Sequence, residues 1–209
     1  MAIQKLFPTS VWRANLKPPG RNKSVDAFND SLLRECYAFR EMDDAGRRWS
    51  KKNYVAGYTS YSSIANLHER SSGFEALKQA IDKEVMSFAK HLEMDLQGKR
   101  LAISSFWINI MGTNAHHSFH LHPLSAISGT YYVKVPKDSG TFKIEDPRIT
   151  CFMGSPPRKA SAREENQRYI NLLCKPGEIL LFESWLKHEV PANRASVDRV
   201  SISFNYDWI

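Results

Sequence analysis

The chain has 209 residues, 42% of them hydrophobic and 24% charged, and its formal net charge is +7. The length fits one large domain or two small ones, and the composition is typical of a globular protein, which excludes disorder over most of the chain. No apolar run approaches the roughly 18 residues needed to span a bilayer, and the first residues lack the apolar stretch of a secretory signal. We therefore expect a cytoplasmic protein without a membrane partner.

The excess of basic residues is compatible with nucleic acid as a partner, but the support is weak. Basic residues are scattered, and the modest clusters at residues 47–52 and 158–163 lack the pattern of an aromatic stacking platform. A solvated basic surface is the preferred interpretation. Cys36, Cys151 and Cys174 are too few for a disulfide framework, which fits a reducing compartment, and we expect them to be inert packing residues.

The N-terminal half predicts an extended segment at residues 8–16 and two supporting helices. The first helix begins near Val25 and the second near Gly73, with Ser71 or Ser72 available as its cap. In both, apolar residues recur every three or four positions, which places one stripe against a core. Residues 43–72 are rich in Gly, Ser, Tyr and Asn and have no sustained period. We expect a loop there, either a binding segment or lid, or an irregular surface connection.

After residue 98 the pattern changes to short strands rich in β-branched and aromatic residues. The predicted strands are residues 101–111, 128–135, 141–145, 168–173, 178–182, 188–190 and 200–206. Many short, closely spaced strands favour an antiparallel sandwich or barrel. No internal repeat and no linker divides the chain, so one core is the simpler reading. Residues 153–167 form a polar insertion, which we expect to be mobile and which could arch over a site.

Two histidines separated by one residue are the leading candidates for metal ligands. In a strand, side chains alternate between faces, so His120 and His122 would point the same way. The distant His188 would complete a facial set of three if another strand brought it across the sheet, an arrangement that suits non-haem iron. His116 and His117 compete, but we interpret them as turn residues at the mouth of the site. The alternative is that the pair is merely solvated or lies at the edge of the core.

An arginine begins the last predicted strand. Alternation places Arg199, Ser201 and Ser203 on one face and the apolar residues between them on the other. A guanidinium inside a barrel is costly unless an anion pairs with it, and it can hold a carboxylate through two hydrogen bonds. Beside a metal site, Arg199 would therefore require an acidic cosubstrate. The alternative is a rim arginine that pairs with Asp198 or Glu189.

Several segments taken together resemble a known family, the Fe(II)/2-oxoglutarate-dependent oxygenases of prokaryotes and phages. The resemblance covers residues 106–209 and, more weakly, residues 57–61. It rests on residues 177–188 (GEILLFESWLKH), 190–193 (VPAN), 199–205 (RVSISFN), 120–123 (HLHP), 128–133 (SGTYYV), 139–142 (SGTF) and 145–148 (EDPR). The segments are specific for this family when they occur together in this order, whereas no single segment is specific for it.

The resemblance implies a mainly β protein with a double-stranded β-helix, a cupin-like jelly roll, and N-terminal α-helices packed on one sheet. Together with the helices and loop predicted from the sequence pattern, it predicts one oxygenase domain over residues 1–209, in which residues 1–98 supply helical support and the lid and residues 99–209 form the catalytic core. By the same resemblance, His120 and His122 match the paired iron ligands and His188 matches the distal ligand. No catalytic side chain is implied beyond the metal centre.

The resemblance also assigns a cosubstrate site. Arg199 matches the residue that holds the distal carboxylate of 2-oxoglutarate, with Ser201 beside it, and Tyr132 matches a tyrosine that assists the same carboxylate. Asn109 is a looser candidate for the cosubstrate or substrate pocket. Trp107, Tyr131 and Trp185 are candidates for the pocket lining, although aromatic residues at such spacings are more often core.

The chain departs from the wider superfamily at His122, which stands where an aspartate or glutamate ligand is usual. Without this carboxylate the iron centre carries one more positive charge. Asp146 and Glu183 are conceivable carboxylate donors, but neither occupies the family position.

The sequence is compatible with two rival functions. One is a cupin-like protein with three histidine ligands that does not use 2-oxoglutarate, and the other is a non-catalytic β-sandwich binding module. The sequence identifies neither the substrate nor the oligomeric state.

Overall fold

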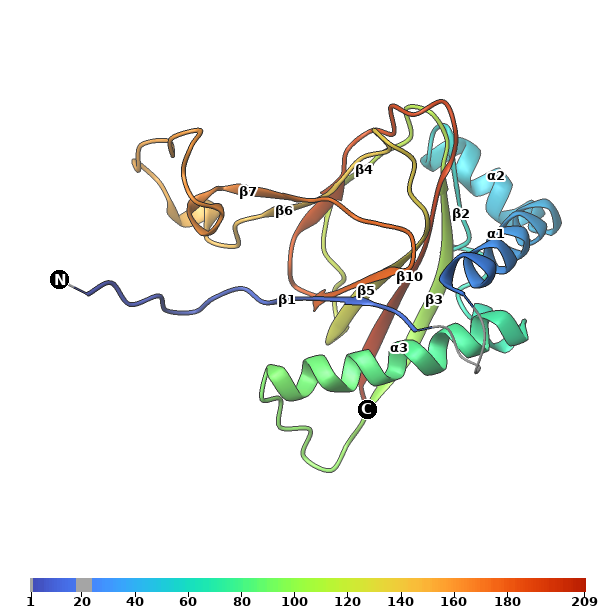
Figure 1. The fold of residues 1–209 in the computed structure, drawn as a ribbon, viewed down its shortest axis with the longest axis horizontal. Coiled ribbons are helices and arrows are strands. Elements are labelled where there is room, and N and C mark those ends of the chain that lie inside the picture. The colour runs from blue at the N-terminus through green and yellow to red at the C-terminus, as the bar shows by residue number, and fades with distance from the viewer. Residues whose placement is uncertain (1, 18–23) are drawn as a thin grey trace.

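The computed structural model describes residues 2–17 and 24–209 (Figure 1). Its strands form two sheets whose neighbouring strands are all antiparallel. The larger sheet has the order β1 (Val11–Asn15), β8 (Glu178–Glu183), β5 (Ile127–Lys134), β10 (Arg199–Trp208), β3 (Leu101–Met111), β2 (Gly57–Thr59). The smaller sheet has the order β4 (His117–His120), β9 (His188–Val190), β6 (Phe142–Glu145), β7 (Tyr169–Leu172).

The eight strands from β3 to β10 divide between the sheets in the pattern of a jelly roll. β3, β5, β8 and β10 lie in the larger sheet, and β4, β6, β7 and β9 lie in the smaller one. The chain therefore crosses repeatedly between the two layers, which is how a jelly roll is closed from two antiparallel sheets. The predicted mainly β architecture is confirmed, and β1 lies within the extended segment predicted at residues 8–16.

Among the described residues, three α-helices support the larger sheet (Figure 1). The helix α1 (Val25–Met42) is capped by Ser24, whose hydroxyl accepts a hydrogen bond from the Ala27 amide at 3.1 Å. The helix α3 (Ser72–His91) is capped by Ser71, as predicted. Their apolar stripes join the same core cluster as one face of the larger sheet, which confirms that the helices pack on that sheet.

The last strand shows how alternation divides this sheet into two environments. Val200, Ile202 and Phe204 are fully buried in the core under the helices. The residues between them face the other way, into the space enclosed by the two sheets, where they line a pocket. Because the period of a strand is two, one side stabilises the fold and the other presents polar groups.

The prediction that residues 43–72 form a loop is wrong. They contain the helix α2 (Asp44–Asn53), the strand β2 and the short 3-10 helix η1 (Leu67–Glu69). The helix α2 gave no apolar period because the residues it buries, Gly46 and Ser50, are small. Its start is fixed instead by Asp43, whose buried carboxylate accepts hydrogen bonds from the Gly46 amide and the Tyr58 hydroxyl.

The segment between β6 and β7 extends beyond the edge of the smaller sheet (Figure 1). It contains the 3-10 helices η2 (Ile149–Cys151) and η3 (Glu164–Asn166), and its predicted mobility stays a prediction. No helix within residues 2–17 and 24–209 has an apolar stretch that could cross a membrane.

Candidate functional site

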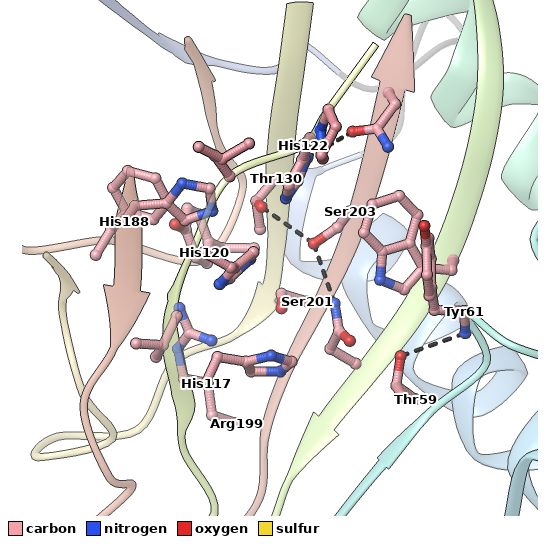
Figure 2. Close-up of a pocket in the computed structure, with 18 of the residues that line it drawn as sticks. Thr59, Tyr61, His117, His120, His122, Thr130, His188, Arg199, Ser201 and Ser203 are labelled. Atoms are coloured by element: carbon pink, nitrogen blue, oxygen red, sulfur yellow. Dashed lines mark hydrogen bonds between the residues drawn. The ribbon is translucent and has the colours of Figure 1, made fainter. Parts of the chain in front are cut away.

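Three histidines that are distant in sequence meet between the two sheets (Figure 2). His120 ends β4 and His188 begins β9, and the two residues are direct partners in the antiparallel pairing of these strands. His122 lies two residues beyond His120, just after the strand, where its amide donates a hydrogen bond to the Ser184 carbonyl at 2.9 Å. One side-chain nitrogen from each histidine lies within 4.8 Å of those of the other two.

The hydrogen bonds of the three rings select the nitrogen that is free to bind a metal. The Nδ1 atom of His120 lies 2.7 Å from the Ser118 carbonyl oxygen, and that of His188 lies 2.8 Å from the Leu186 carbonyl oxygen. A carbonyl only accepts, so each Nδ1 carries the hydrogen and each Nε2 keeps its lone pair. These two rings are thus held through Nδ1, as metal-binding histidines usually are, and their Nε2 atoms are left to bind a metal.

His122 is fixed by side chains rather than by the backbone. Its Nδ1 donates to Asn205 Oδ1 at 2.6 Å, and the Ser128 hydroxyl, 2.8 Å from the same Nδ1, also donates to Asn205 Oδ1. Ser128 in turn lies 2.7 Å from the Ser184 hydroxyl. Asn205 continues the alternation that begins at Arg199, so extending that pattern by one step would have found it from the sequence.

The site favours neutral imidazoles. Burial lowers the pKa of His122 to about 4, although its hydrogen bond to Asn205 opposes the shift. Burial, followed by the nearby His120, also lowers the pKa of His188 well below its usual value. Neutral imidazole is the form that binds metal. Within the part of the chain that the structure describes, no carboxylate joins this group, and Asp146 is instead paired with Arg148.

The interpretation of His117 as a turn residue at the mouth is wrong. His117 is the first residue of β4 and lines the pocket, whereas His116 is exposed and precedes the strand. Residues three apart on a regular strand point to opposite faces, but a register irregularity between His117 and His120 turns both inward. Burial lowers the pKa of His117 to about 3.

Arg199 is a buried cation without an anion among the described residues. Its side chain is only 2% exposed, its Nη1 donates to the Met111 sulfur at 3.2 Å, and its Cζ lies 5.1 Å from the centre of the Tyr132 ring. The alternative of a rim arginine is wrong, because Asp198 accepts a hydrogen bond from Tyr37 and Glu189 pairs with Lys143. The guanidinium is therefore available for an anion from outside the chain.

The structure places the other predicted cosubstrate residues around the same pocket. Ser201, Tyr132 and Asn109 all line it together with Arg199. Asn109 Nδ2 donates to the Ser203 hydroxyl at 3.0 Å, and Ser203 lies 3.1 Å from the Thr130 hydroxyl, which forms a polar row across three adjacent strands (Figure 2). The Asn109 Oδ1 atom is buried without a partner among the described residues.

The pocket has a volume of about 320 Å³, and aromatic rings line part of it. Trp107, one of the candidates for the lining, lies in the wall, and its ring contacts Tyr61 with a separation of 4.9 Å between centres. Tyr131 and Trp185 do not line the pocket, because Tyr131 is in the core bonded to Asn29 and Trp185 is 47% exposed. Trp49 and Tyr61 also line the pocket, and they come from residues 43–72, whose sequence has no sustained apolar period.

The chain is similar in sequence to one protein family and in fold to several solved structures. Residues 105–205 match the family described as "Putative 2OG-Fe(II) oxygenase". No curated protein sequence matches the chain. The chain spans 58% of the length of an oxidoreductase of the 2OG-Fe(II) oxygenase family from Burkholderia pseudomallei, with 16% identity over 66% of this chain and a TM-score of 0.48.

Other solved structures are similar over nearly the whole chain. The non-heme alpha ketoglutarate dependent epimerase SnoN from nogalamycin biosynthesis is 11% identical, with coverage of 95% of this chain and 76% of that chain and a TM-score of 0.61. A Pseudomonas putida prolyl-4-hydroxylase is 13% identical, with coverage of 95% and 92% and a TM-score of 0.57. HygX from Streptomyces hygroscopicus, solved with nickel and 2-oxoglutarate, is 12% identical, with coverage of 95% and 83% and a TM-score of 0.58. At these identities the likeness establishes the fold, the double-stranded β-helix.

Proposed function

We propose that this chain, which belongs to the 2OG-Fe(II) oxygenase family through residues 105–205, is an Fe(II)- and 2-oxoglutarate-dependent dioxygenase that hydroxylates its substrate. The single observation that carries this proposal is the coexistence, in one pocket, of three convergent histidines and a buried arginine without an anion. The three histidines can bind a metal, and the buried arginine can bind an acidic cosubstrate.

The donor set fits a divalent iron. Imidazole nitrogens of His120, His122 and His188 would hold the metal and would leave its other positions to other ligands, which an oxygenase requires. The ligand set carries no negative charge, so the centre is one charge more positive than one built with a carboxylate. An anionic cosubstrate that binds next to it would reduce this excess, which favours the uptake of a dicarboxylate.

Arg199 fits the far end of such a dicarboxylate. A guanidinium that is 2% exposed and bonded only to a thioether sulfur among the described groups is strongly unfavourable until an anion reaches it. A carboxylate can accept two of its hydrogen bonds at once. Ser201 lies beside it in the pocket wall, where its hydroxyl can contact the same carboxylate, and the Tyr132 ring packs on the guanidinium.

Iron, when bound by the three histidines, would supply the activation of dioxygen, and this chain would position the reactants and exclude water. In the overall reaction, 2-oxoglutarate loses its first carboxylate as carbon dioxide and becomes succinate by taking one oxygen atom of O₂. The second oxygen atom enters a C–H bond of the substrate as hydroxyl. The two electrons from 2-oxoglutarate and the two from the C–H bond complete the reduction of O₂.

The outer part of the pocket supports a neutral or apolar reacting group. Among the described residues that line it there is no carboxylate, and Arg199 is already assigned to the cosubstrate. Trp49, Tyr61 and Leu121 are 40%, 54% and 44% exposed, so their apolar surfaces can meet a substrate. Because about 320 Å³ must also hold the metal and 2-oxoglutarate, only a small part of the substrate fits inside.

The unpaired cysteines support a reducing compartment such as the cytoplasm.

Succinate formation from 2-oxoglutarate tests the proposal directly. Purified protein with Fe(II), ascorbate and O₂ should release succinate, and candidate substrates should raise the rate. His188→Ala should abolish both metal binding and succinate release. Arg199→Met should keep the metal and lose 2-oxoglutarate binding.

The three functions considered give different results in this experiment. Metal binding without measurable affinity for 2-oxoglutarate would contradict the proposal and favour a cupin-like protein. Failure to bind any divalent metal would favour a binding module without catalysis. Arg100→Met, at an exposed arginine, is the matched control and should behave as the parent protein.

A further inference from the structure

Four buried polar atoms on Arg199 and on the aromatic side chains around it have no hydrogen-bond partner among the described residues. They are Nε2 of His117, the hydroxyl oxygens of Tyr54 and Tyr132, and Nε of Arg199. Buried polar atoms in proteins are nearly always paired, because an unpaired one has lost its water without compensation. A group of such atoms therefore indicates a missing ligand.

The side chains that carry these atoms are packed together. The rings of Tyr54 and His117 are 4.4 Å apart between centres, at an angle of 48°. Tyr54 also shares a small apolar cluster with Met111, whose sulfur accepts the hydrogen bond from Arg199. Figure 2 shows His117 and Arg199 at the same end of the pocket, away from His122.

The chemistry of this end of the pocket suits a carboxylate. Arg199 offers several N–H groups, and a neutral imidazole offers one N–H. A carboxylate has about four acceptor sites, so one that pairs with Arg199 has capacity left for another donor. His117 lines the pocket, whereas Tyr54 lies behind it in the apolar cluster.

We propose that His117 is a second cosubstrate-binding residue, which donates a hydrogen bond from Nε2 to the distal carboxylate of the 2-oxoglutarate that pairs with Arg199. This inference rests on the proposed function. Tyr54 is a positioning residue whose ring packs on the imidazole and fixes its direction. The set of Arg199 and His117 then selects a dicarboxylate over a monocarboxylic 2-oxo acid.

The proposal also gives the N-terminal segment a role in the cosubstrate site. Tyr54 directly follows α2 and lies outside residues 105–205, which match the oxygenase family. Its ring is 6% exposed, so it is held by the fold and does not move freely. The helix α2 carries Trp49 to the substrate side of the same pocket, so one segment contacts both ends of the site.

Calorimetric binding of 2-oxoglutarate to Ni(II)-loaded protein tests the role of His117 without turnover. His117→Phe keeps a ring against Tyr54 and removes the donor, and it should weaken 2-oxoglutarate binding by about 10- to 100-fold. His117→Gln restores a donor and should recover part of this loss. Affinity for Ni(II) alone should stay within about twofold, because His117 is outside the metal-binding group.

A second ligand separates a contact with the distal carboxylate from a general disturbance. 2-Oxopentanoate carries the same 2-oxo acid group but lacks the distal carboxylate, so His117→Phe should leave its binding unchanged. Equal losses for both ligands, or no loss for 2-oxoglutarate, would overturn the inference while leaving the proposed function intact. If the parent protein itself does not bind 2-oxoglutarate, the proposed function fails.

Tyr54 is tested by a pair of variants. Tyr54→Ala removes the ring that packs on His117 and should weaken 2-oxoglutarate binding several-fold. Tyr54→Phe keeps the ring and should restore the parent affinity. A loss in Tyr54→Phe as large as that in Tyr54→Ala would contradict the positioning role.

Discussion

Replacement of Arg199 by methionine should stabilise the protein that lacks metal and cosubstrate. The guanidinium is 2% exposed, and its hydrogen bond goes to a sulfur atom rather than to an anion. The effective cost of burying an unpaired charge is several kcal/mol, and apolar replacement of buried charged groups stabilises proteins by roughly 1–4 kcal/mol. Methionine has a similar length and is compatible with the neighbouring Met111 sulfur and Tyr132 ring. We expect a gain of about 2 kcal/mol in the free energy of unfolding.

The same substitution should remove the stabilisation by 2-oxoglutarate. For the parent protein with metal, 2-oxoglutarate at about 100 times its dissociation constant should add about 2.7 kcal/mol. Arg199→Met should show no such increment, so its two effects have opposite signs. Urea denaturation with EDTA measures the first effect, and denaturation with Ni(II) and 2-oxoglutarate measures the second. The gain of about 2 kcal/mol corresponds to roughly 4–8 °C in melting temperature.

The reasoning would be refuted by a loss of stability in the absence of ligands. If Arg199→Met lowered the free energy of unfolding by more than about 1 kcal/mol, the guanidinium would have to be satisfied within the chain. Arg100→Met is the control, because substitution of an exposed arginine should change stability by less than about 0.5 kcal/mol.

Three further predictions concern ligand orientation, pH and the helix α2. Asn205→Leu removes the acceptor that holds His122 Nδ1 and should lower metal affinity by about 10- to 100-fold. Asn205→Asp keeps an acceptor and should leave metal affinity unchanged. Calorimetric metal titration measures the affinity of both variants. Because burial lowers the pKa of His117 from 6.5 to about 3, only the unfolded chain takes up its proton near pH 5. Stability should therefore fall between pH 7 and 5 by about 2 kcal/mol through this residue, and urea titrations of His117→Phe should show that much less pH dependence. Asp43→Ala removes the carboxylate that accepts hydrogen bonds from Gly46, Tyr58 and Ser63, and it should lower the free energy of unfolding by about 3 kcal/mol. Asp44→Ala, at an exposed position, should lower it far less, and urea denaturation measures both variants.

Features with a local period could be predicted from the sequence. The apolar stripes of α1 and α3 and the alternation of β10 depend only on spacing along the chain, so the pattern revealed both the elements and the faces they bury. The apolar pattern did not predict α2, because a helix that buries only small residues shows no apolar stripe. Its position is decided by the hydrogen bonds of Asp43 to groups as far away in sequence as Ser63.

The sequence by itself identified the candidate site residues: the His-x-His pair, the later histidine and the arginine that leads a polar strand face. Only the tertiary structure decided how they meet. His120 lies opposite His188 because β4 and β9 pair in that register, and His117 points inward because of the irregularity between these paired positions. Register and bulges depend on which strands become neighbours, and that choice is made by burial over the whole chain rather than by local spacing. For the same reason the isolation of Arg199 from any anion could be recognised only once all its described neighbours were in place.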